Sequence, residues 1–177
     1  TFDGQTAIIE LPGAGITHVL FERFIETDRL VISNQRLKHT RRSGWVEVTV
    51  GVLEQGGSYH ALAPSVTVAE GTVLSVEEKF QGGTGINLTP PPPDIVGTTQ
   101  LEAAKRRIEQ VAQILGIGGY ARIDAFIETA TGNIHVIEAN TLPALTPSTV
   151  IFHQALAERT PVEPLPFLEG LVASAGY

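Results

Sequence analysis

The sequence predicts an α+β fold in which an antiparallel sheet is flanked by helices. Residues 45–53, WVEVTVGVL, alternate between two faces and are rich in β-branched side chains, which is typical of a strand. Residues 120–128 and 133–140 are two further alternating runs, and the Gly and Asn in the link between them favour a hairpin. Residues 98–116 repeat apolar side chains at helical spacing, which predicts one of the helices.

Length and composition set the class of protein. The 177 residues, 42% of them hydrophobic, suit a single domain spanning 1–177. A net charge of −7 argues against nucleic acid as a partner, and the absence of cysteine excludes disulfides and thiolate catalysis. The sequence has no apolar run of about 18 residues and no signal-peptide pattern, so we expect a cytoplasmic protein without a membrane partner. It also has no methionine, so we expect a processed chain or a piece of a longer one.

Between the clearest strands, the sequence predicts further elements. Alternation favours strands over residues 17–26, 59–68 and 73–80, with Pro64 marking an edge. Residues 27–44 hold five of the twelve basic residues. They are interpreted as a solvated insertion loop in preference to a flap that faces phosphate or a partner, although Leu30-Val31-Ile32 has the composition of a short strand.

Glycines and prolines mark the remaining boundaries. Residues 81–97 carry three early glycines and four consecutive prolines, which indicates an active-site loop or a plain linker. For the helix over 98–116, Thr99 and Glu102 form an expected capping box and Gly116 an expected stop. Near the C-terminus, Thr146 and Pro147 predict the start of a helix over 148–158, and a last short helix is expected over 167–175.

The predicted hairpin at 120–140 carries polar side chains on one face. A register that pairs Glu128 with Ile134 places Asp124 opposite Glu138 and Arg122 opposite Asn140. Two neighbouring carboxylates repel each other unless a cation lies between them, and carboxylate and amide oxygens suit Mg²⁺. The alternative is a solvated face on which Arg122 pairs with one of the carboxylates.

The order of these elements and three motifs resemble a known family. The motifs are Arg122-Ile123-Asp124, Glu138-Ala139-Asn140-Thr141 and Leu142-Pro143-Ala144-Leu145-Thr146. Together they resemble the C-terminal portion of ATP-grasp ligases, most closely the D-alanine–D-alanine ligase family, over residues 17–176. The resemblance implies an ATP-dependent carboxylate–amine ligase that forms a peptide or amide bond through an acyl-phosphate.

The resemblance also implies roles for individual residues. ATP with Mg²⁺ (or Mn²⁺) would be the cofactor, and amino-acid-like small molecules the substrates. The metal ligands would be Asp124, Glu138 and Asn140. The catalytic groups would be Arg122 and the backbone N–H of Ala144. The nucleotide would contact Glu22, Arg23, Ile25, Glu47 and Lys79. The second substrate's carboxylate would be held by Ser148 or Thr149.

Several departures from the family pattern bear on activity. Phe80 stands where the family has tyrosine, so the acceptor need not be D-alanine, and Ala144 stands where it has glycine. Residues 27–44 resemble an insertion. The family's N-terminal region would lie upstream of Thr1 and would act as a partner, so we expect the chain alone to be inactive. The alternative is a non-catalytic nucleotide-binding or partner-binding domain, and the sequence leaves oligomerisation open.

Overall fold

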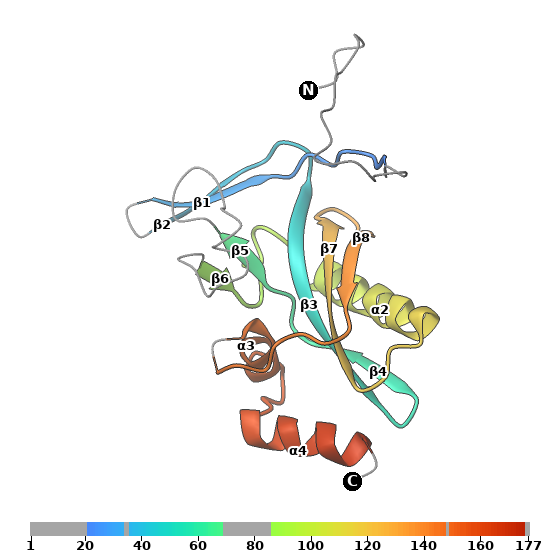
Figure 1. The fold of residues 1–177 in the computed structure, drawn as a ribbon. Helices are drawn as coiled ribbons and strands as arrows, with labels where there is room; N and C mark the ends of the chain where they lie inside the picture. The colour runs from blue at the N-terminus through green and yellow to red at the C-terminus, as the bar shows by residue number, and fades with distance from the viewer. Residues whose placement is uncertain (1–20, 34–35, 69–85, 148, 176–177) are drawn as a thin grey trace, which may run out of the picture.

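The computed structural model describes residues 21–33, 36–68, 86–147 and 149–175 (Figure 1). At its centre is a four-stranded sheet in the order β4-β3-β7-β8, with every neighbouring pair antiparallel. The strands are β3 (Trp45–Gln55), β4 (Ser58–Ala61), β7 (Tyr120–Glu128) and β8 (Ile134–Asn140). The predicted α+β fold with an antiparallel sheet is therefore confirmed.

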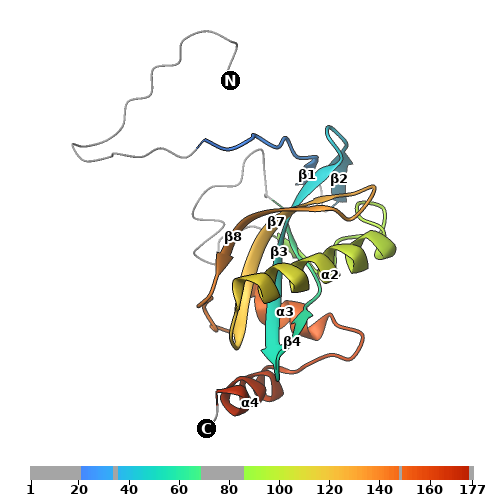
Figure 2. The same ribbon diagram turned by 90° about the vertical axis from the view of Figure 1, so that its right-hand side faces the viewer.

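Two helical layers cover opposite faces of this sheet (Figures 1 and 2). Helix α2 (Thr98–Leu115) packs its buried face, centred on Ala104 and Ile108, against one side of the sheet. That side presents buried apolar residues from β3 and β7: Val46, Val48, Val50, Val52, Ala121, Ile123, Ala125 and Ile127. Because side chains alternate along a strand, the residues between them point to the other side.

Among the described residues, helices cover the second side of the sheet at one end. Helices α3 (Val150–Leu156) and α4 (Pro164–Ser174) form a smaller core there with Leu53 and Leu62. Gly51 of β3 is required at the contact, because a Cβ built on it would lie 2.8 Å from both Ile151 and Gln154 of α3. The rest of this side of β3 and β7 therefore stays available for polar residues.

Residues 27–44 are mostly a β-hairpin, so the interpretation as a loop is wrong. Strand β1 (Arg29–Ser33) pairs with β2 (Arg36–Thr40) in an antiparallel register. The hairpin forms because three apolar side chains, Leu30, Ile32 and Leu37, pack against the main core. Its basic residues Arg29, Arg36 and Lys38 are exposed.

The structure differs in part from the other strands and the loop predicted between residues 17 and 97. Residues 21–26 have no regular structure, so the strand expected over 17–26 is wrong in its described part, where Phe21 and Phe24 are more than 80% exposed. The run 59–68 splits around Pro64 into β4 and β5 (Val66–Val68), and β5 pairs with β6 (Ile86–Leu88), inside the expected loop. The strand expected over 73–80 lies outside the described residues.

All three predicted helices are present in the structure, but their ends differ from the predicted ends. For α2, Gly116 is the predicted C-terminal stop with φ 64°, but Gly97 is the N-cap and no side chain caps the helix, so the capping box is absent. For α3, Thr149 is the N-cap in place of Thr146, because the Thr149 N–H bonds to the Thr146 carbonyl in a turn that precedes the helix. Helix α4 begins at Pro164, ahead of the expected start.

Candidate functional site

The hairpin of β7 and β8 has the predicted register at the end that lies away from its turn. Asp124 lies opposite Glu138, and Arg122 lies opposite Asn140. At the turn the prediction is one residue off, because Ile127 and not Glu128 pairs with Ile134. A bulge after Asp124 accounts for the difference, since Ala125 pairs with Val136 and Ile137 is left as an extra residue.

The polar side chains of this hairpin contact one another on the open side of the sheet. Arg122 Nη2 lies 3.1 Å from Asp124 Oδ2 and 4.0 Å from Glu138 Oε1. Asn140 Nδ2 donates to Glu138 Oε1 at 3.1 Å. The side chains of Arg122 and Asp124 are 24% and 16% exposed, whereas that of Glu138 is 50% exposed. Two carboxylates, one amide and one guanidinium therefore meet at the rim of the sheet.

Strand β3 adds a further group that the sequence did not single out. Thr49 is paired with Asp124, and its Oγ1 donates to Asp124 Oδ1 at 2.8 Å. Thr49 and Glu47 share a face of β3 because side chains alternate along a strand, but only the pairing of β3 with β7 shows which carboxylate Thr49 meets. Glu47 is half-buried and lies on this same face, opposite Phe126.

The residues present fit a divalent cation with an anion beside it. Asp124, Glu138 and Asn140 offer hard oxygen donors of the kind that Mg²⁺ takes. Arg122 Nε is buried and has no hydrogen-bond partner within the described part of the chain, which leaves a donor for a further anionic oxygen. No cluster of three or more His, Asp or Glu that could hold a metal occurs among the described residues, so the amide of Asn140 would be needed as the third ligand.

The loop after β8 is tied to β7 by a side-chain hydrogen bond. Tyr120, on β7, donates its hydroxyl to the carbonyl of Pro143 at 3.2 Å. Pro143 is buried and the next residue, Ala144, is exposed. Thr149 follows at the N-cap of α3 and is half-buried. This loop therefore leaves the end of β8 with a fixed starting direction.

The remaining predicted residues are not brought to the same place by the described structure. Glu22 and Arg23 are exposed and Ile25 is half-buried, in a segment without regular structure. Any backbone contact from residues 21–26 to a ligand would therefore come from a segment without strand structure. Lys79 and Ser148 lie outside the described residues, as does Phe80.

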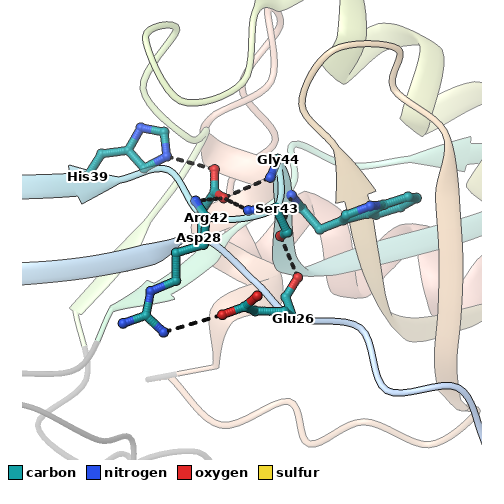
Figure 3. Close-up of polar contacts among 7 residues, drawn as sticks. Glu26, Asp28, His39, Arg42, Ser43 and Gly44 are labelled. Carbon is teal, nitrogen blue, oxygen red and sulfur yellow. Dashed lines mark hydrogen bonds and ion pairs between the residues drawn. The ribbon is translucent and has the colours of Figure 1, made fainter.

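A second polar cluster, built around a single carboxylate, lies at the base of the β1–β2 hairpin, and no sequence pattern pointed to it. Asp28 is buried, and its Oδ1 accepts from the backbone N–H groups of Arg42, Ser43 and Gly44 at 2.8, 3.0 and 2.8 Å (Figure 3). His39 Nε2 donates to Oδ2 at 2.9 Å. Burial raises the pKa of Asp28, but these hydrogen bonds, from Arg42 first, outweigh burial and lower the pKa to about 2.

A third polar cluster ties α2 to β4 and to the end of α3. Glu158 Oε1 lies 2.9 Å from Lys105 Nζ, and its Oε2 lies 3.4 Å from His60 Nε2. The hydrogen bond to Glu158 raises the pKa of His60. Burial raises the pKa of Glu158, but the hydrogen bonds from His60 and Lys105 lower it below its usual value. This cluster joins α2, β4 and the chain just after α3.

Comparison with known proteins agrees with this fold. The family model described as "D-ala D-ala ligase C-terminus" matches residues 19–163. A D-alanine–D-alanine ligase of Leptospira biflexa is 28% identical over 147 residues, which are 81% of this chain and 41% of the relative. The chain thus spans well under half the length of that curated relative, and a relative from Coprothermobacter proteolyticus is matched over 33% of its length.

Two solved structures share the fold. D-alanyl-alanine synthetase A from Vibrio cholerae superposes with a TM-score of 0.55 at 19% identity, covering 80% of this chain and 41% of that structure. The D-alanine–D-alanine ligase from Bacillus anthracis, a complex with ATP, gives a TM-score of 0.54 at 18% identity, covering 78% and 42%. No helix in the described parts of the chain is long and apolar enough to cross a membrane.

The family model and the fold together place the protein in the ATP-grasp class. Within that class, the chain belongs to the family of D-alanine–D-alanine ligase C-terminal domains. The resemblance drawn from the three sequence motifs is therefore confirmed.

Proposed function

We propose that this chain is the Mg·ATP-binding portion of an ATP-dependent carboxylate–amine ligase. The observation that carries the proposal is the meeting of Arg122, Asp124, Glu138 and Asn140 on one face of β7 and β8. The family membership supports it, as does the relative whose structure contains ATP.

Asp124, Glu138 and Asn140 would hold Mg²⁺, or Mn²⁺ in its place. Asp124 and Glu138 are direct cross-strand neighbours, and like charges in that arrangement destabilise a sheet. A divalent cation between them would remove the repulsion, and when bound it would neutralise charge on the nucleotide phosphates. The guanidinium of Arg122 contributes part of this compensation within the protein itself.

Arg122 would also stabilise the acyl-phosphate and the tetrahedral intermediate that follows it. A carboxylate oxygen of the first substrate attacks the γ-phosphorus of ATP, and ADP leaves. An amine nitrogen then attacks the acyl carbon, loses its proton, and phosphate departs as the amide bond forms. The Nε of Arg122 has no hydrogen-bond partner among the described residues, which supports this role, and the backbone N–H of Ala144 would assist it.

The other assigned roles extend the same proposal to nucleotide and substrate. Glu47, on the same face as Thr49 and Asp124, would bind the ribose hydroxyls. The backbone at Glu22, Arg23 and Ile25 would line the adenine pocket, and Lys79, from the chain before the 81–97 loop, would reach phosphate. Thr149 or Ser148 would hold the carboxylate of an amino-acid-like second substrate.

A second candidate function is nucleotide or partner binding without ligation. Ala144 favours it, because the family has glycine there and the added methyl group would crowd the intermediate. Phe80 favours it as well, since the family's tyrosine hydroxyl is missing. The ligase proposal requires the family's upstream region as a partner that supplies the other half of the site. Binding without ligation does not require it.

Turnover distinguishes the two candidates. The protein in its full encoded length is incubated with Mg·ATP and pairs of amino acids, and ADP release is measured. The first proposal predicts ADP release that depends on the amino acids and is abolished in Asp124→Ala. If no pair supports release although Mg·ATP binds, the binding function is the better account.

A further inference from the structure

The carboxylate of Asp124 is held at both oxygens by donors from two different strands. Thr49 Oγ1, on β3, donates to Oδ1 at 2.8 Å, and Arg122 Nη2, on β7, donates to Oδ2 at 3.1 Å. Thr49 is the direct cross-strand partner of Asp124. Because each oxygen has its own donor, the two bonds fix the plane of the carboxylate as well as its position.

This fixation matters because an aspartate does not set its own orientation. The terminal torsion of Asp, between an sp³ and an sp² carbon, is broad, so the carboxylate plane follows its hydrogen bonds. Thr49 is a suitable donor, because a β-branched side chain in a strand is restricted at its first torsion. Each oxygen of Asp124 keeps acceptor capacity beyond these two bonds, which a cation can use.

The backbone of Thr49 is itself anchored from a second direction. Its N–H and its carbonyl both bond to the backbone of Ser65, each at 2.9 Å, and the carbonyl also accepts from Gln154 Nε2 at 2.7 Å. Gln154, on α3, is fully buried and accepts from the N–H of Gly51 at 2.7 Å. Helix α3 thus holds the stretch of β3 from which the hydroxyl projects, so the donor is preorganised.

We propose that Thr49 is the positioning residue for Asp124: its hydroxyl sets the orientation in which that carboxylate meets the metal, and Gln154 holds the strand that carries it. This inference rests on the proposed function, because it takes Asp124 as a metal ligand. It adds a residue that touches neither nucleotide nor substrate and that acts only through Asp124.

The test measures metal binding directly. Binding of Mn²⁺ to the protein in its full encoded length is followed by electron paramagnetic resonance in the presence of ATP. Thr49→Val keeps the shape of the side chain and removes the donor. It should raise the Mn²⁺ dissociation constant about 10-fold or more, as loss of a hydrogen bond to a metal ligand does elsewhere. Thr49→Ser restores the hydroxyl and should return most of the affinity.

A matched threonine serves as the control. Thr67, on β5, donates its hydroxyl to Asn87 on the neighbouring strand at 2.8 Å, so Thr67→Val removes a similar bond away from Asp124. That variant should bind Mn²⁺ as the unchanged protein does. The inference is overturned if Thr49→Val binds Mn²⁺ as tightly as Thr67→Val while Asp124→Asn loses binding. If Asp124→Asn keeps full affinity, the proposed function itself fails.

Discussion

Two polar clusters in this protein, each built around carboxylate groups, follow opposite principles. Asp28 is buried, and its oxygens accept from three backbone N–H groups and from His39. Asp124 and Glu138 lie side by side at the rim of the sheet, with half of the Glu138 side chain exposed. The protein directs four of its own donors at Asp28, whereas the second cluster brings like charges together beside an Arg122 nitrogen that lacks a partner in the described residues.

The difference indicates what each cluster contributes. A buried carboxylate with four donors stabilises the fold and holds the chain at the base of the β1–β2 hairpin. Adjacent carboxylates at the rim of a sheet cost stability unless a cation joins them, and such an arrangement is retained where binding requires it. Substitutions at the two clusters should therefore separate stability from function.

The largest expected effect is on turnover, from substitutions in the cluster of Asp124 and Glu138, here called the open cluster. Glu138→Gln keeps the size of the side chain but removes one negative charge from the metal site. We expect ADP formation to fall about 100-fold, because charge neutralisation by the metal carries much of phosphoryl transfer. Because Glu138 is half exposed and its charge lies opposite that of Asp124, the unfolding midpoint should not fall. A variant with full turnover would remove Glu138 from the site.

At the enclosed cluster, which is Asp28 with its four donors, the expected effect is on stability. In Asp28→Asn the charge that four donors point at is lost, and one of the two acceptor oxygens becomes an NH₂ group that must face either the three backbone N–H groups or His39 Nε2. We expect the free energy of unfolding in urea to fall by about 2–3 kcal/mol, as for a broken buried hydrogen-bond network. Mn²⁺ binding should not change. Loss of metal binding in this variant, with the fold intact, would show that the two clusters are coupled.

The dependence of the unfolding free energy on pH in the acid range should reveal the contribution of Asp28. The pKa of Asp28 is lowered from 3.8 to about 2, so its folded form favours the carboxylate. Because a pKa change of one corresponds to about 1.4 kcal/mol, that preference contributes about 2 kcal/mol above the unfolded pKa and is lost as the pH falls through the folded pKa. Urea unfolding across the acid range should therefore show a smaller loss of stability in Asp28→Asn than in the unchanged protein.

The smallest effect is expected at His60. Its pKa is raised by Glu158, so its stabilising contribution is complete below its usual pKa of 6.5 and is lost as the pH rises through the folded value. His60→Asn should flatten the change of the unfolding midpoint on the alkaline side of pH 6.5. His135→Asn is the control, since that exposed ring contacts Trp45 and no carboxylate in the described interactions. An unchanged pH profile in His60→Asn would exclude the ion pair as a source of stability.

The open cluster was more predictable from the sequence than the enclosed one, for physical reasons. Alternation in two adjacent runs showed which faces Arg122 and Asp124 share, and a short link with Gly132 limited the possible registers. The bulge at Ile137 was not predictable, because nothing in local composition marks an extra residue. Thr49 and Asp28 meet their partners only through the pairing of segments 75 and about 15 residues apart, which strand patterns do not specify.

The measurement that tests the central claim most directly is the shift of the unfolding midpoint on adding Mg·ATP. A ligand that binds only the folded protein raises this midpoint by an amount that grows with its affinity. The account predicts a clear rise for the full-length protein and for Asp28→Asn, from a lower starting midpoint, and no rise for Asp124→Asn. An equal rise in Asp124→Asn and in the unchanged protein would contradict the assignment of the β7–β8 carboxylates as the metal–nucleotide site.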